Sequence, residues 1–135
     1  MDGAVASHIL EHLPGESFFH FMRELWRASK HGAVTEITLP HPSHDIFLND
    51  PTHARPIMPG TMAMFDRAYL AALAARGDYL TSFAERCGVD FRFGPTVRYD
   101  FDPAISKDDP DLERRMKYER NVIFMWHSTL TAVKR

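Results

Sequence analysis

Two histidines and a glutamate with the spacing of metal ligands or acid–base groups stand near the start of the chain. His8, Glu11 and His12 form a His-x-x-Glu-His pattern directly after a short apolar run, residues 4–6. Imidazole nitrogens and carboxylate oxygens bind divalent metals, and two imidazoles with one carboxylate suit zinc or iron better than magnesium. A buried parallel strand delivers polar side chains in this way at its carboxyl end, where ligands bind in open α/β sheets.

Further histidines lie in a proline-rich segment, residues 40–60, which we expect to be a lid loop over the same end of the sheet. Because an imidazole titrates near neutral pH, His41 and His53 are the candidate catalytic bases. His44 and Arg55 are the candidate contacts to the substrate. The alternative is a solvated loop with turn-forming prolines, in which Arg55 pairs with a neighbouring aspartate.

Hydrophobic periodicity predicts the elements that hold these residues. Apolar residues recur at helical spacing in two segments and form short β-like runs in four others. The predicted helices cover residues 18–25 and 61–76, the latter capped by Thr61, and the predicted strands cover residues 4–6, 33–39, 89–99 and 121–133. The interval between the first two strands is long enough for a right-handed βαβ crossover, and we expect the last two to pair antiparallel. Residues 103–120 are polar and predict a loop or a short helix.

The predicted fold class is therefore α/β. It is a partial Rossmann-like sheet with strand-helix-strand-helix order and a terminal antiparallel strand pair, in a single domain over residues 1–135.

The composition argues against several classes of protein, namely disordered, nucleic-acid-binding and membrane-spanning ones. Hydrophobic residues make up 44% and charged residues 25%, which is typical of globular rather than disordered chains. The net charge of −2 gives no electrostatic reason to expect nucleic acid, and no apolar stretch is long enough for a membrane span. Cys87 is the single cysteine, so no internal disulfide forms. We expect a cytoplasmic protein with neither a membrane nor a nucleic-acid partner.

Three segments resemble, in the correct order, the second half of class I S-adenosylmethionine-dependent methyltransferases of the type 11-like group. Residues 6–13 match the Leu-Glu-His-Leu segment after strand four, and residues 49–56 match an Asp-Pro-Thr-His-x-Arg loop after strand five. Residues 24–33 match the helix end before strand five, except that His31 stands where proline is usual and Ala33 where a second glycine is usual. The resemblance covers nearly the whole chain.

The resemblance implies the cofactor S-adenosylmethionine and an unidentified methyl acceptor, such as a small molecule. It places Ser7 and His8 near the methionine end of the cofactor. The family's glycine-rich loop and the acidic residue that binds the ribose are absent, and Gly3 and Gly15 do not replace them. We therefore expect a fragment that does not methylate alone and that exposes the edge of its first strand, an edge through which the chain can form a homo-oligomer. The alternative is a noncatalytic methyltransferase-like remnant or dimerization module.

Three interpretations of the His-x-x-Glu-His segment remain open. In the first it is family scaffolding, in which Glu11 and His12 orient the following turn. In the second it binds a divalent metal, because ubiquinone O-methyltransferases and small-RNA 3′-end methyltransferases carry Glu-x-x-Glu-His here. His8 then replaces the first glutamate, and His53 lies where the RNA enzymes place another ligand. In the third it is the inverted zinc-peptidase motif on a helix, with Glu85 as a further ligand.

Overall fold

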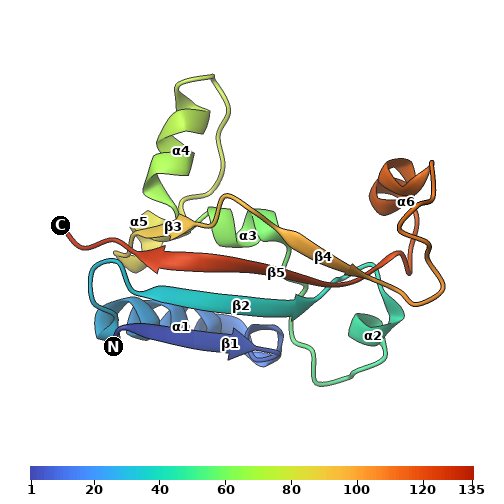
Figure 1. Ribbon diagram of the computed structural model, residues 1–135. Helices are drawn as coiled ribbons and strands as arrows, with labels where there is room; N and C mark the ends of the chain where they lie inside the picture. The colour runs from blue at the N-terminus through green and yellow to red at the C-terminus, as the bar shows by residue number, and fades with distance from the viewer.

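The structure is a computed structural model that describes residues 1–135 and shows an open, mixed β-sheet with helices packed on one face (Figure 1). The strands are β1 (Gly3–Ser7), β2 (Val34–Pro40), β3 (Phe91–Phe93), β4 (Arg98–Phe101) and β5 (Ile123–Ala132). The helices are the 3₁₀ turn η1 (Leu10–His12), α1 (Gly15–Ala28), α2 (Asp45–Leu48), α3 (Pro59–Ala63), α4 (Arg67–Ala74), α5 (Phe83–Cys87) and α6 (Leu112–Tyr118). No helix is long and apolar enough to cross a membrane.

The sheet has the order β1-β2-β5-β3, and β4 also pairs with β5. β1 and β2 are parallel, whereas β5 runs antiparallel to β2, β3 and β4. This confirms the predicted partial Rossmann-like sheet with an antiparallel ending. The predicted strand at 89–99 is two strands, separated at Gly94 and Pro95. A Cβ at Gly94 would lie 2.5 Å from Thr129 Oγ1, so this close approach to β5 requires glycine.

The first βαβ unit forms as its periodicity predicts. Phe18, Met22 and Leu25 lie on one stripe of α1 and are buried in the same core cluster as Ile37 and Leu39 of β2. Fully burying each of these side chains contributes about 1.5–3 kcal/mol. The amphipathic stripe and the alternating strand therefore fix which face of the sheet α1 covers (Figure 1).

The predicted helix over residues 61–76 is wrong, because the chain forms α3 and α4 with a break before Arg67. Asp66 lies beyond the end of α3 and caps α4 by accepting a hydrogen bond from Tyr69 N (3.0 Å). The same buried carboxylate accepts from Phe93 N (3.0 Å) and Arg92 (2.6 Å) of β3. Thr61 is the third residue of α3 rather than its N-cap, and its hydroxyl accepts a hydrogen bond from the backbone N–H of the N-cap residue Met58 (3.3 Å). A long-range contact to β3 therefore overrides the local helical pattern.

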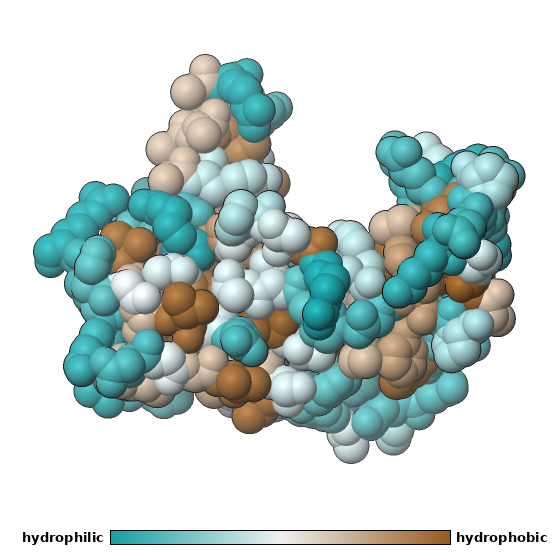
Figure 2. Space-filling model, in the orientation of Figure 1, coloured by the Kyte–Doolittle hydropathy of each residue, from teal (hydrophilic) through white to brown (hydrophobic).

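The opposite face of the sheet carries no helix in Figure 1. Along β2, Thr35 and Ile37 are buried toward α1, whereas Val34 and Glu36 are exposed on the other side. Val5 of β1 is 72% exposed. Figure 2 views this face and shows brown apolar residues scattered among teal and white ones. We call it the open face.

Candidate metal centre

The carboxyl end of β1 places the His-x-x-Glu-His segment beside the start of the proline-rich segment. His8 leaves the strand with a left-handed φ of 51°, and its N–H donates to Thr38 O of β2 (3.0 Å). The chain then turns into η1, which holds Glu11 and His12. Residues 8–12 therefore do not form the α-helix that the zinc-peptidase interpretation requires.

The segment around His53 is bound directly to this turn. Glu11 O accepts hydrogen bonds from Ala54 N (2.7 Å) and Arg55 N (3.3 Å). The Arg55 guanidinium donates to Leu13 O (3.1 Å) and Gly15 O (2.9 Å) and lies over the Phe18 ring. Arg55 thus joins the two segments and makes no ion pair with an aspartate, and its substrate-binding role stays a prediction.

Glu11 is a buried carboxylate without a hydrogen-bond donor. Its residue is 1% exposed, and neither Oε1 nor Oε2 has a hydrogen-bond partner. His8 Nδ1 and His12 Nε2 lie 3.4 Å and 3.9 Å from Oε1, and neither forms a hydrogen bond with it. Buried polar groups are nearly always hydrogen-bonded, and a buried charge needs a partner. No group of the protein therefore donates a hydrogen bond to the Glu11 carboxylate, and its charge lacks a partner.

Two imidazoles are held beside this site through their Nδ1 atoms. His12 Nδ1 lies 3.0 Å from Thr52 Oγ1, whose own hydroxyl donates to Asp50 Oδ1, and 3.3 Å from Thr52 O. His53 Nδ1 donates to Phe47 O (2.7 Å). Both Nδ1 atoms therefore carry a proton, so in the neutral ring the Nε2 lone pair is free to bind a metal. A metal-binding histidine is held in this way, with its other ring nitrogen donating to a carbonyl or a similar acceptor.

The ligand atoms converge. One ligand atom each from Glu11, His12 and His53 lies within 4.8 Å of the others, and the two imidazole rings meet edge to face at 4.7 Å. Asp50 Oδ2 lies 3.6 Å from His53 Nε2. The Thr52 side-chain hydrogen bond, followed by the Thr52 backbone N–H, holds the pKa of Asp50 below its usual range. The orphaned carboxylate and the two oriented imidazoles fit a divalent metal with a position left open for another ligand.

The side chain of His44, in the predicted lid segment, bonds to other groups of the protein. Its Nδ1 accepts from Ile46 N (3.1 Å), which caps α2, and its Nε2 donates to Asp102 Oδ2 (2.9 Å). The Ala104 backbone N–H, and then His44, lower the pKa of Asp102. Both ring nitrogens of His44 are therefore occupied by the protein, and its substrate-binding role remains a prediction.

His41 is buried at the carboxyl end of β2 and is not part of the metal cluster. Its Nδ1 accepts from Ser43 N (3.2 Å) and lies 2.7 Å from Ser43 Oγ, so the ring proton is at Nε2, which makes no hydrogen bond. Burial, and then the nearby His44, lower the pKa of His41. His41 lines a hollow of about 610 Å³ together with residues of the α6 region. In this tautomer the imidazole presents a donor to that hollow.

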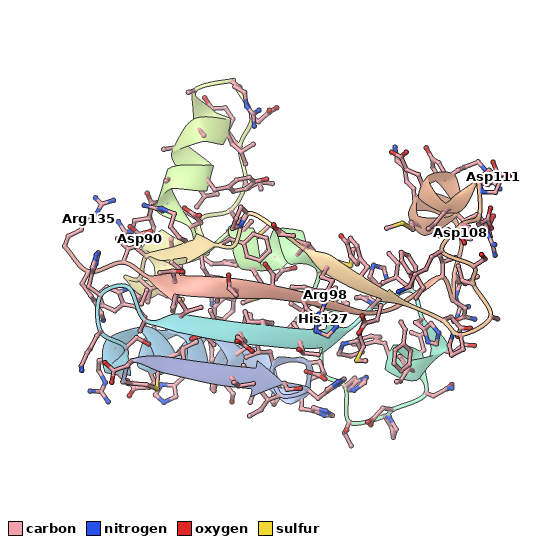
Figure 3. All side chains as sticks on the ribbon, in the orientation of Figure 1. Asp90, Arg98, Asp108, Asp111, His127 and Arg135 are labelled. Atoms are coloured by element: carbon pink, nitrogen blue, oxygen red, sulfur yellow. The ribbon has the colours of Figure 1, made fainter.

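A second histidine group, which the sequence did not indicate, lies on the open face. His127 Nε2 donates to Asp100 Oδ2 (2.6 Å), and its Nδ1 lies 2.9 Å from Thr38 Oγ1. Arg98 is the direct cross-strand neighbour of His127, and Figure 3 shows the two side chains together in the middle of this face. The period-two alternation of β5 is the signal that could have placed His127 on this side. We call Thr38, His127 and Asp100 the open-face triad.

The comparisons with known proteins bear on the fold. The chain matches no family model and no curated protein. It is similar to the crystal structure of a SAM dependent methyltransferase from Archaeoglobus fulgidus, with a TM-score of 0.57 and 17% sequence identity. The alignment covers 97% of this chain and 59% of that chain. The likeness shows a methyltransferase-type fold, over a region that spans about three-fifths of the compared protein.

Proposed function

We propose that this chain is the acceptor-side half of an S-adenosylmethionine-dependent methyltransferase, and that Glu11, His12 and His53 hold a divalent metal for the acceptor. The observation that carries the proposal is the buried Glu11 carboxylate, which lacks any hydrogen bond while one ligand atom each of His12 and His53 lies within 4.8 Å of it. The similarity in fold to a methyltransferase supports the reaction class. The sequence resemblance to metal-dependent relatives points to the same residues.

The contacts of each site residue indicate its role in binding the metal and the acceptor. Glu11 brings the negative charge, whereas His12 and His53 bring neutral nitrogens oriented by Thr52 O and Phe47 O. When bound there, zinc or iron supplies a Lewis acid that fixes and polarises an acceptor oxygen. His41 contributes a hydrogen-bond donor from the neighbouring hollow. In the observed tautomer it orients an acceptor oxygen rather than removing a proton.

The contacts that this chain offers to S-adenosylmethionine are less complete than those it offers to a metal. Ser7 and His8 are exposed at the carboxyl end of β1, where the resemblance places the methionine end of S-adenosylmethionine. No glycine-rich turn lies beside them, because η1 follows directly. A glycine-rich turn is what lets backbone approach a nucleotide cofactor closely. The residues of this chain therefore do not by themselves bind the nucleotide part, and we propose no methyl-transfer step for the chain alone.

Metal titration tests the site. Calorimetry of the metal-free chain with zinc is expected to show one tight site, which Glu11→Gln removes while keeping nearly the same side-chain shape. Asp100→Asn in the open-face triad is the matched control and should leave the affinity unchanged. Absence of stoichiometric zinc binding, or equal loss in both variants, would contradict the proposal.

A separate measurement tests the cofactor contacts. Amide NMR spectra with increasing S-adenosylmethionine should show weak, saturable shifts at Ser7 and His8 and none at Thr129 on the open face. Tight calorimetric binding to the monomeric chain would show that the chain holds the whole cofactor, contrary to our expectation. The absence of any shift at Ser7 and His8 would remove the support for a cofactor site at the end of β1.

A further inference from the structure

The hollow beside His41 lies between two segments that are far apart in the sequence. Residues 41–43 and Met58 form one wall, and residues 116–120, at the end of α6 and just after it, form the other. The Arg120 guanidinium donates to Asp45 Oδ1 (2.6 Å) and so ties the second wall to the start of α2. The volume of about 610 Å³ falls within the range of about 300–1,000 Å³ that is usual for small-molecule sites. In Figure 1, α6 stands apart from the sheet, and none of its residues is buried.

The inner wall of this hollow offers one hydrogen-bond donor. His41 is 6% exposed, and its Nδ1 accepts from Ser43 N (3.2 Å). The Nε2–H group has no partner in the protein, and His41 lines the hollow, so this group is the one available to a ligand. Burial lowers the pKa of His41 and keeps the ring neutral at neutral pH. A buried donor of this kind needs an acceptor atom, which a ligand in the hollow would supply.

The charged residues of the hollow leave one positive charge uncompensated. Arg120 pairs with Asp45 (2.6 Å), and Glu119 pairs with two arginines of α6 at 2.9 Å and 3.2 Å. Lys117 forms no ion pair, and its ammonium lies 5.3 Å from the centroid of the Tyr118 ring. The hollow therefore offers a ligand one cation and one neutral donor.

The remaining lining of the hollow is apolar or aromatic. Met58 is 41% exposed and Tyr118 is 71% exposed, whereas Met116 and Pro42 are half-buried. Methionine side chains adapt to the shape of a ligand, and their sulfur atoms make favourable contacts with aromatic rings. Two methionines on facing walls therefore suit a flat aromatic ring between them.

We propose that this hollow binds an aromatic monocarboxylate. Its carboxylate accepts a hydrogen bond from His41 Nε2 and pairs with Lys117, while its ring packs against Met58 and Met116. One cation with one neutral donor matches a single negative charge, whereas a phosphate ester dianion would call for a second cation such as a bidentate arginine. The inference rests on the proposed function in one respect, namely that the bound acid is the methyl acceptor. Binding of the acid requires neither zinc nor S-adenosylmethionine.

Calorimetry of the metal-free chain with 2-naphthoate tests the ligand class. We expect one saturable site. The uncharged 2-naphthamide, which has nearly the same shape, should bind at least about tenfold more weakly, because it lacks both the ion pair and the charge-assisted hydrogen bond. The dianion 2-naphthyl phosphate should bind no more tightly than 2-naphthoate. Equal affinities for naphthoate and naphthamide, tighter binding of the phosphate, or no saturable binding of naphthoate would overturn the inference.

Two lysine variants test the position of the site. Lys117→Met keeps the length of the side chain and removes its charge, so affinity for 2-naphthoate should fall about fivefold, the upper range for an exposed ion pair, while 2-naphthamide binding is unchanged. Lys107→Met is the matched control, because Lys107 is also exposed but does not line the hollow. Equal weakening by the two variants, or none by Lys117→Met, would overturn the assignment.

The imidazole contact has its own readout in the unmodified chain. Saturation with 2-naphthoate should shift the Nε2 resonance of His41 in long-range ¹H–¹⁵N NMR spectra and leave that of His53 unchanged, and a shift at His53 alone would contradict the inference. A chain that binds zinc but not naphthoate would lose this inference and keep the metal site. A chain that binds naphthoate but not zinc would keep the carboxylate site and lose the proposed function.

Discussion

Two groups in this molecule combine a carboxylate with histidine, and they differ in how their polar atoms are satisfied. In the open-face triad, Asp100 accepts a hydrogen bond from His127, whose other nitrogen contacts Thr38. At the end of β1, Glu11 is more deeply buried, yet it accepts no hydrogen bond. The first group is complete without a ligand, whereas the second lacks a positive partner.

The difference teaches that residue types alone do not identify a metal site. Asp100 has a partly exposed carboxylate and a donor at 2.6 Å, so its charge is already accommodated. The Nδ1 atoms of His12 and His53 are bound to Thr52 and Phe47, which leaves their Nε2 atoms available, and one ligand atom of each ring lies within 4.8 Å of Glu11. Orientation of the ring nitrogens, rather than proximity, distinguishes ligands from hydrogen-bonding residues.

The largest expected effect is on zinc affinity. Glu11→Gln removes the only anionic ligand of the cluster, so we expect affinity to fall at least about 100-fold, because a change merely beside a ligand already costs 10–100-fold. Asp100→Asn should change affinity less than about twofold. Competition titration with a chromophoric chelator measures both. Equal affinities for Glu11→Gln and the wild type would remove the distinction between the two groups.

The next effect is on the stability of the metal-free chain. Glu11→Leu replaces an unpaired buried carboxylate with an apolar group of similar volume, which should raise the free energy of unfolding by about 1–3 kcal/mol. Asp100→Leu breaks a satisfied pair and should lower it by at most about 1 kcal/mol, because the pair is partly exposed. Urea unfolding without metal checks both signs. Destabilisation by Glu11→Leu in the absence of metal would mean that the carboxylate is satisfied by the protein.

A smaller effect comes from the residues that orient the histidines. Thr52→Val removes the hydroxyl beside His12 Nδ1 but leaves the Thr52 carbonyl, so zinc affinity should fall about tenfold. Thr38→Val makes the same change beside His127 and should leave zinc affinity unaltered. The same chelator competition compares them, and equal values for the two valine variants would contradict the assigned orientation of His12.

The smallest effect concerns His41, which belongs to neither group. Burial lowers the pKa of His41, so the folded state binds its proton less readily than the unfolded state. Its contribution to stability is therefore complete above the ordinary histidine pKa of about 6.5 and decreases as pH falls from there to the lowered folded value. His41→Gln should flatten this part of the stability profile, because the glutamine side chain does not titrate. An unchanged slope in urea unfolding below about pH 6.5 would contradict it.

The sequence predicted the parts of the fold that follow from local pattern. The stripe of Phe18, Met22 and Leu25 predicted α1, and the β-branched run before Pro40 predicted β2. The prediction of one helix over residues 61–76 was wrong, because the break before Arg67 depends on contacts of Asp66 to Phe93 and Arg92, far along the chain. Helix α5, with 5 residues, is too short to show a period.

The candidate site was predicted in composition but not in geometry. The spacing of Glu11 and His12 and the resemblance to metal-dependent relatives brought His53 into consideration. Three properties decide between the interpretations, and none can be read from spacing. They are the burial of Glu11, its missing hydrogen bonds and the ring orientation set by Thr52 and Phe47, all of which arise from segments about forty residues apart folding together.

Zinc titration followed by long-range ¹H–¹⁵N NMR of the histidine rings tests the central claim most directly. One equivalent of zinc should shift the Nε2 resonances of His12 and His53 while their Nδ1 atoms stay protonated, and the His127 resonances should not move. Unchanged Nε2 resonances for His12 and His53, or a shift confined to His127, would contradict the account.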